Sequence, residues 1–187
     1  MVGAVGFLLI ITIPRCFEDD PPRNGIKKVY YDSGKLRMEK RYRNYKLNGV
    51  TKEYYEKSGK IWNVYSYKDD RLEGPTQTFY KNGNLRAVRN FVNNLEEGVS
   101  QTFYAGGVIE SETTYVQGLK HGRRQTYYPD AMVMTQEVFA QNVKHGPQRT
   151  FNRNGTPQKV ETYNFGQLVG RTIYDEFGGF VDEEIFE

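Results

Sequence analysis

The two histidines, His121 and His145, are the first residues to consider for metal chemistry, because an imidazole nitrogen is a common zinc ligand. They occupy equivalent places in Lys120-His121-Gly122 and Lys144-His145-Gly146, 24 residues apart. If each such interval adds two strands spaced about 4.8 Å apart, the histidines lie roughly 10 Å apart, too far to share one ion. We therefore predict no metal site, and a turn-stabilising or surface role for both residues.

Other reactive residues are scattered. Cys16 is the single cysteine and has no histidine nearby in the sequence, so a nucleophilic thiol is not expected. The acidic pairs Glu96-Glu97, Glu110/Glu112 and Glu183-Glu184 would need to face each other across a cleft to act as a glycosidase dyad. A solvated sheet edge is the favoured interpretation. No phosphate-binding glycine motif is present, and we predict a protein that is not an enzyme and uses no cofactor.

A cluster of basic residues near the amino terminus is the best candidate binding feature. The predicted binding residues are Lys27, Lys28, Lys35, Arg37, Lys40, Arg41 and Arg43. They could engage anionic lipid headgroups or an acidic protein, or could simply solvate a strand and block aggregation at a sheet edge. Nucleic acid is not expected, because the formal net charge is only +3 and later segments lose the positive excess. The charged residues after Gly170 are mainly acidic, so the charge is polarised along the chain.

Residues 1–16 form an apolar segment that resembles a signal or anchor sequence, and residues 17–24 form a charged, proline-containing linker. The apolar run from Val2 to Ile13 is shorter than the ~20 residues of a membrane-spanning helix. It predicts export or location at the cell envelope, with Cys16 as a candidate for lipidation. A cytoplasmic protein with a wrongly assigned start is the alternative.

Glycine recurs at a nearly constant interval through the rest of the chain, residues 25–187. The positions are Gly25, Gly49, Gly74, Gly98, Gly122, Gly146 and Gly170, separated by 24 residues except for one interval of 25. A fixed period in this range indicates a repeat architecture, in which each unit buries its apolar surface against its neighbours.

Each unit has the same internal pattern. An aromatic pair such as Phe79-Tyr80 follows the first glycine and is itself followed by a turn signal such as Asn82-Gly83. The fifth unit has Pro129-Asp130-Ala131 instead, which predicts a different turn. A second strand then opens on an apolar residue and ends six residues later on an aromatic residue. These closing aromatics are Tyr42, Tyr67, Phe91, Tyr115, Phe139 and Tyr163. The even separation predicts that both ends of this strand share one face, taken as the core face.

The pattern leaves no room for helices. We predict an all-β fold: an elongated, single-layer antiparallel β-meander of six to seven 24-residue hairpin repeats, with about thirteen strands. The units begin at residues 25, 49, 74, 98, 122, 146 and 170, and the irregular last unit is predicted to be a cap.

The segments Gly118-Leu119-Lys120-His121-Gly122 and Asn142-Val143-Lys144-His145-Gly146, with Tyr115 and Phe139 before them, resemble MORN repeats. The whole 24-residue unit resembles the MORN-variant repeats of bacterial proteins labelled YwqK-type antitoxins. This resemblance implies a binding protein that masks a toxin or an envelope protein sterically. The alternative is an envelope-associated scaffold that binds anionic membrane through the basic first unit. The residues leave the partner and the oligomeric state open.

Overall fold

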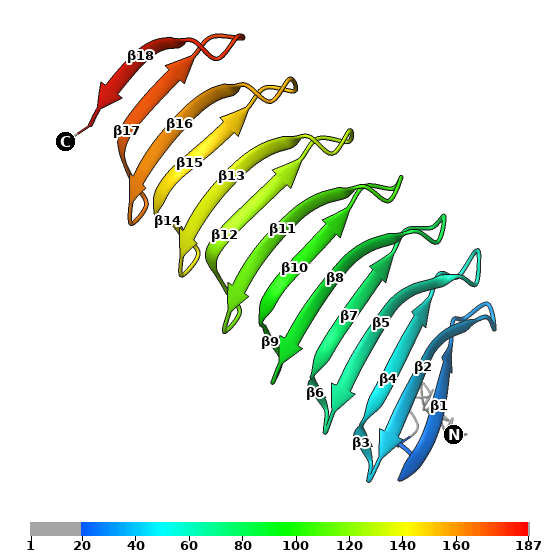
Figure 1. Cartoon of the computed structure of the whole chain (residues 1–187). Coiled ribbons are helices and arrows are strands. Elements are labelled where there is room, and N and C mark those ends of the chain that lie inside the picture. The colour runs from blue at the N-terminus through cyan, green and yellow to red at the C-terminus, as the bar shows by residue number, and fades with distance from the viewer. Residues whose placement is uncertain (1–19, 187) are drawn as a thin grey trace, which may run out of the picture.

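The computed structural model describes residues 20–186, which form one open antiparallel sheet in which strand order follows chain order (Figure 1). The predicted all-β meander is confirmed. The first half of the sheet comprises β1 (Asn24–Tyr30), β2 (Leu36–Arg43), β3 (Lys46–Leu47), β4 (Gly49–Tyr54), β5 (Ile61–Lys68), β6 (Arg71–Leu72), β7 (Gly74–Phe79), β8 (Leu85–Val92) and β9 (Leu95–Glu96). The second half comprises β10 (Gly98–Phe103), β11 (Ile109–Val116), β12 (Leu119–Tyr127), β13 (Val133–Ala140), β14 (Val143–Lys144), β15 (Gly146–Phe151), β16 (Pro157–Asn164), β17 (Gln167–Tyr174) and β18 (Phe180–Ile185).

Seven long hairpins make up the sheet, one for each unit. Figure 1 shows β1 and β18 at opposite ends of it. Four of the 18 strands contain only two residues, which leaves fourteen long strands rather than about thirteen. The extra strand arises because the last unit forms a complete hairpin, β17 with β18. The predicted signal or anchor segment 1–16 and residues 17–19 of the linker lie outside the described residues.

Successive units are joined by tight two-residue turns in which both central residues have positive φ. In the first turn φ is 50° at Asn44 and 64° at Tyr45, and the pairs Asp69-Asp70 and Asn93-Asn94 repeat this geometry. Two positive φ values define the type I′ turn, whose twist matches that of the flanking strands. The sequence therefore places asparagine, aspartate or glycine at most of these positions.

The turn inside each hairpin needs one left-handed residue, which is usually glycine. Gly83 has φ +98° and Gly107 has φ +93°. The expectation of a different turn in the fifth unit is wrong, because Ala131 adopts φ 68° and its N–H donates to the Tyr128 carbonyl at 2.9 Å. The hydrogen bond thus holds Ala131 in the turn found in the other units, although the left-handed conformation is sterically strained for alanine.

The recurring glycines have positive φ in the first six units but not in the seventh. Gly122 has φ +86°, whereas Gly170 lies outside the left-handed region. The reason is a one-residue deletion. Lys159 and Glu161 pair with Ile173 and Arg171, although the alignment on glycine would place Ile173 one residue earlier in its strand. Gly170 is therefore not structurally equivalent to the other six.

The two faces of the sheet differ in composition. We call one the threonine face, because it carries Thr51, Thr76, Thr78, Thr102 and Thr126, and the other the valine face, which carries Val50, Val64, Val88, Val99, Val138 and Val160. These assignments follow from the alternation of side chains along paired strands.

A β-bulge overturns the expectation that each second strand keeps both ends on one face. The register shifts between Glu53 and Tyr54, so that Ile61 pairs with Tyr54 and Trp62 is the extra residue. Alternation is broken at the bulge. Ile61 therefore lies on the valine face with Tyr54, while Tyr67, at the other end of the strand, lies on the threonine face.

A ladder of tyrosine hydroxyls ties each unit to the next. The second aromatic residue of a unit donates to the backbone carbonyl of the first aromatic residue in the following unit. The bonds run from Tyr31 to Tyr54, Tyr55 to Phe79, Tyr80 to Phe103, Tyr104 to Tyr127 and Tyr128 to Phe151, at 2.7 to 2.9 Å. Asn152 interrupts the ladder, since its amide donates to Thr156 of its own turn. These hydrogen bonds explain why an aromatic pair, rather than a single aromatic residue, recurs.

The sheet has almost no conventional core. Within the described residues, Ala87 is the only buried hydrophobic residue, and most of the remaining buried residues are small polar ones along the middle of the threonine face, such as Thr51 and Ser100. The other aromatic and aliphatic side chains on both faces are half-buried or exposed. A single layer therefore leaves two extensive surfaces available for binding.

Candidate binding surfaces

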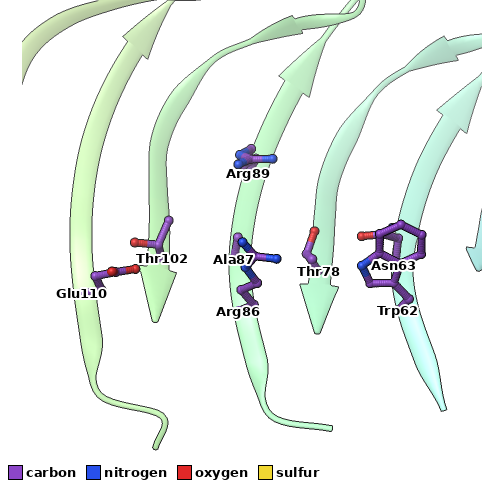
Figure 2. Close-up of a pocket in the computed structure, with 8 residues that line it drawn as sticks. All are labelled: Trp62, Asn63, Thr78, Arg86, Ala87, Arg89, Thr102 and Glu110. Carbon is purple, nitrogen blue, oxygen red and sulfur yellow. The ribbon is translucent and has the colours of Figure 1, made fainter. Parts of the chain in front are cut away.

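A shallow hollow of about 340 Å³ lies on the threonine face, across the second to fourth units (Figure 2). Its floor is formed by the small side chains of Asn63, Thr78, Ala87 and Thr102. Trp62, Arg86, Arg89 and Glu110 complete the lining. The β-bulges place Trp62 and Arg86 here, because each is the extra residue of its strand.

Two tyrosines lie against the lining residues Trp62 and Arg86. Tyr55 stacks on Trp62 with ring centroids 5.7 Å apart, and the Arg86 guanidinium lies 5.7 Å from the Tyr80 ring centroid. Both tyrosine hydroxyls are held in the ladder. Tyr, Trp and Arg are the residues that most often anchor protein interfaces, but only Trp62 and the two arginines are exposed here.

Farther along the threonine face, charged side chains neutralise one another. Arg124 and Lys144 flank Glu137, and Lys159 and Arg171 flank Glu161. Burial opposes ionisation of Glu161, but the hydrogen bonds and charges of Lys159 and Arg171 outweigh it and lower the pKa of Glu161. The Glu161 carboxylate is thereby held ionised, which suits a structural role better than proton transfer.

The predicted acidic pairs do not form dyads. Glu110 lines the hollow, whereas Glu112 accepts hydrogen bonds from Gln101 and Tyr127 on the valine face. Glu96 accepts a hydrogen bond from the Ser100 hydroxyl, and Glu97 accepts one from the backbone N–H of Gln117 in the next turn. Adjacent residues of a strand point to opposite faces, so Glu183 and Glu184 are also separated by the sheet.

In several units, the side chain at the histidine position accepts a hydrogen bond from the two-residue turn of the next unit. The Phe165 N–H donates to His145 Nδ1 at 3.4 Å, and the two rings lie 4.4 Å apart. Glu73 and Glu97 occupy the equivalent position in other units. Their carboxylates accept hydrogen bonds from the backbone N–H groups of Asn93 and Gln117, in the next two-residue turn. The turn-stabilising prediction is confirmed for His145, while His121 is exposed. In residues 20–186 no group of three or more potential metal-ligating side chains comes together, and Cys16 lies outside this part of the chain.

The seven basic residues predicted to bind are divided between the two faces. Lys27 and Lys40 are paired across β1 and β2 on the threonine face, and Arg37 lies 5.8 Å from the Tyr31 ring. Lys28 lies on the valine face, 3.7 Å from Glu39, with Arg41 and Arg43. Lys35 lies in the turn between the two strands. The structure therefore brings these cations into one unit but not onto one surface.

An aliphatic patch on the valine face was not predicted from the sequence. Its six members flank the two-residue turns that follow the third, fourth and fifth hairpins. We define the aliphatic patch as Val92, Leu95, Val116, Leu119, Ala140 and Val143. All except Ala140 are between 39% and 49% exposed. The Leu95 side chain also reaches the two-residue turn of the next unit, because a Cβ added at Gly118 in that turn would lie 3.5 Å from it.

Cations occupy the equivalent positions in the first two units. We define the cationic flank as Arg43, Lys46, Lys68 and Arg71, all of which are exposed. Asn164 and Gln167 take these positions in the sixth unit. The row beside the turns thus changes from positive to aliphatic to neutral polar along the sheet.

No helix long and apolar enough to cross a membrane is found between residues 20 and 186.

Comparison with known families identifies four of the seven units. Residues 23–44, 72–93, 96–117 and 144–165 each match the family model described as MORN repeat variant. Each match covers one hairpin and ends at the first residue of the following two-residue turn. Four units of the chain therefore match MORN-variant repeats, as the resemblance predicted, while the narrower likeness to antitoxins stays a prediction. No curated protein matches the chain.

Proposed function

We propose that this repeat module of MORN-variant hairpins binds another protein through the aliphatic patch. The observation that supports the proposal is the contiguous exposure of five large aliphatic side chains in three successive units. Grouped apolar side chains on a soluble surface often mark an interaction site. The rigid turns beside them keep the ordering cost of binding low.

The cationic flank indicates the chemistry of the partner. Arg43, Lys46, Lys68 and Arg71 stand beside the aliphatic patch on the same face. A complementary surface would present an apolar ridge with acidic residues along one side. In such an interface the apolar contact supplies most of the affinity, and the charges chiefly set orientation and association rate.

The finer proposal is an antitoxin or immunity-type role, in which the sheet covers the partner sterically. It rests on the resemblance of the repeats to antitoxin proteins. In this proposal the chain contributes shape and surface alone. The partner would arrest growth when produced by itself.

The test compares wild type with the double variant Leu95→Gln, Leu119→Gln. Gln167 occupies the equivalent position in the sixth unit, so the fold accommodates glutamine there. Proteins captured from the native host would be purified and their affinities measured directly. Loss of two half-exposed leucines from a buried contact should weaken binding by about tenfold or more.

The matched control is Val50→Gln, Val181→Gln, which replaces two residues of comparable exposure (45% and 56%) outside the aliphatic patch. The control should bind like wild type. If the leucine variant and wild type bound the partner with equal affinity, the aliphatic patch would not be part of the interface. For the finer proposal, wild type but not the leucine variant should restore growth to cells that produce the partner.

Binding to anionic lipid through the basic first unit is the rival function. Its predicted residues are divided between two faces, so a flat membrane could engage only some of them at once. Vesicles of phosphatidylserine and phosphatidylcholine discriminate between the two functions. Binding that requires phosphatidylserine and is lost in Lys28→Glu, with no protein partner captured, would favour the rival.

A further inference from the structure

The end strands β1 and β18 have outer edges of opposite charge. Among the described residues, β1 pairs with β2 alone and β18 with β17 alone. Lys27 and Lys28 lie on β1, while Asp182, Glu183 and Glu184 lie on β18. An unpaired strand edge is a template for pairing with another chain.

Every junction inside the sheet has the same plan, in which the second strand of one unit pairs with the first strand of the next. The register at these junctions is constant. Equivalent pairs are Glu39 with Lys52, Val64 with Gln77, Val88 with Gln101, Gln136 with Arg149, and Val160 with Thr172. β18 is the second strand of the last unit and β1 is the first strand of the first.

If β18 met β1 of another copy in this register, Glu183 would lie opposite Lys28. Asp182 would lie opposite Val29, by the same equivalence. Glu39 and Lys52 already form this combination of charges within the chain. Oppositely charged residues directly across two strands stabilise their pairing.

Apolar side chains are also unusually exposed at the two ends. Phe180 is 66% exposed, although its equivalents such as Ile61 and Ile109 are half-buried. Tyr30 is 55% exposed, although its equivalent Tyr54 is half-buried. A further hairpin at either end would cover them, as it does inside the sheet.

We propose that the chain assembles head to tail, with β18 of one copy pairing antiparallel with β1 of a second copy. The sheet then continues across the boundary with the spacing of the internal repeats. Two β1 edges repel each other, and so do two β18 edges, so only unlike ends pair. Such a heterologous contact extends into open chains unless its rotation closes a ring.

One internal feature is missing from this contact, which makes it weaker than the junctions within the chain. Asp175 takes the place of the ladder tyrosine in the last unit, and it accepts hydrogen bonds from Phe177 and Gly179 in its own turn. No tyrosine hydroxyl is therefore supplied to Tyr30 of the next copy. The assembly should be reversible and dependent on protein concentration.

Sedimentation velocity of the full chain tests the proposal at about 0.05 M and 0.5 M salt, because surface charge pairs are screened at the higher value. At low salt the mean mass of wild type should rise with concentration above the 21.7 kDa of one chain. Glu183→Lys leaves the Lys28–Glu39 contact intact and should weaken association roughly tenfold. Combining it with Lys28→Glu should restore association.

Lys81→Glu is the control, since Lys81 is exposed in a turn far from both ends and its reversal changes the net charge as much as Lys28→Glu does. It should associate like wild type, and circular dichroism would verify folding of every variant. A wild type that stays monomeric at all concentrations and at low salt would overturn the proposal. So would association that survives Glu183→Lys but is lost in Leu95→Gln, Leu119→Gln, since the second copy would then occupy the aliphatic patch.

Discussion

Replacing Gly122 by alanine should destabilise the fold through backbone conformation alone. Gly122 has φ +86°, and a Cβ built on it meets no heavy atom within 4 Å. The left-handed conformation costs a residue with a Cβ roughly 1–2 kcal/mol. Alanine also has less freedom than glycine in the unfolded chain, which offsets about 0.4–1 kcal/mol. We expect a net loss of about 1 kcal/mol.

Gly170→Ala is the matched comparison, because Gly170 belongs to the same sequence series but lacks positive φ. Its Cβ would lie 3.6 Å from the Glu184 carbonyl oxygen, an ordinary contact. This variant should be as stable as wild type or slightly more stable. Urea unfolding followed by circular dichroism measures both, and the variants should differ by roughly 1–2 kcal/mol with similar m-values. Equal stability of the two variants would refute the assignment of a left-handed role to the recurring glycines.

Tyr80→Phe removes one hydroxyl of the ladder, bonded at 2.7 Å, and should cost about 1 kcal/mol in thermal unfolding. Tyr30→Phe, which alters an exposed residue outside the ladder, should cost much less, and equal losses would contradict the ladder's role. Ala131→Gly relieves φ 68° and should raise the unfolding free energy by about 0.5–1 kcal/mol, whereas a loss of stability would show that Ala131 is unstrained. Burial and then the Glu39 hydrogen bond and charge raise the pKa of Tyr54 to about 12, and burial with Glu53 raises that of Tyr65 to about 12. The unfolded chain then loses these protons first, near pH 10, so stability should fall as pH rises from about 10 to 12. Tyr54→Phe should reduce that dependence in denaturant titrations at a series of pH values, and an unchanged slope would exclude Tyr54 as a source.

The repeat period and turn residues predicted the architecture well because both are local signals. Gly83 and Asn94 stand where positive φ is needed, and strand length follows from the distance between turns. The sequence could not show that a bulge reverses alternation at Trp62. A bulge depends on the pairing register of two strands, which no single strand encodes.

Binding surfaces were less predictable than the fold. Clustering of cations between Lys27 and Arg43 in the sequence suggested one patch, but alternation divides them between two faces. Conversely, Val92 and Leu119 are far apart in the sequence and come together only because the units stack. Aligning the residues on either side of each two-residue turn would have revealed the aliphatic patch, since those positions always share a face.

Protection of backbone amides from hydrogen exchange, measured with and without the captured protein partner, tests the binding surface most directly. We predict slower exchange around residues 92–95, 116–119 and 140–143, the turn ends that carry the aliphatic patch, with weaker effects at the cationic flank. Protection confined to the basic first hairpin, or to the strands around Trp62 and Arg86, would contradict binding through the aliphatic patch.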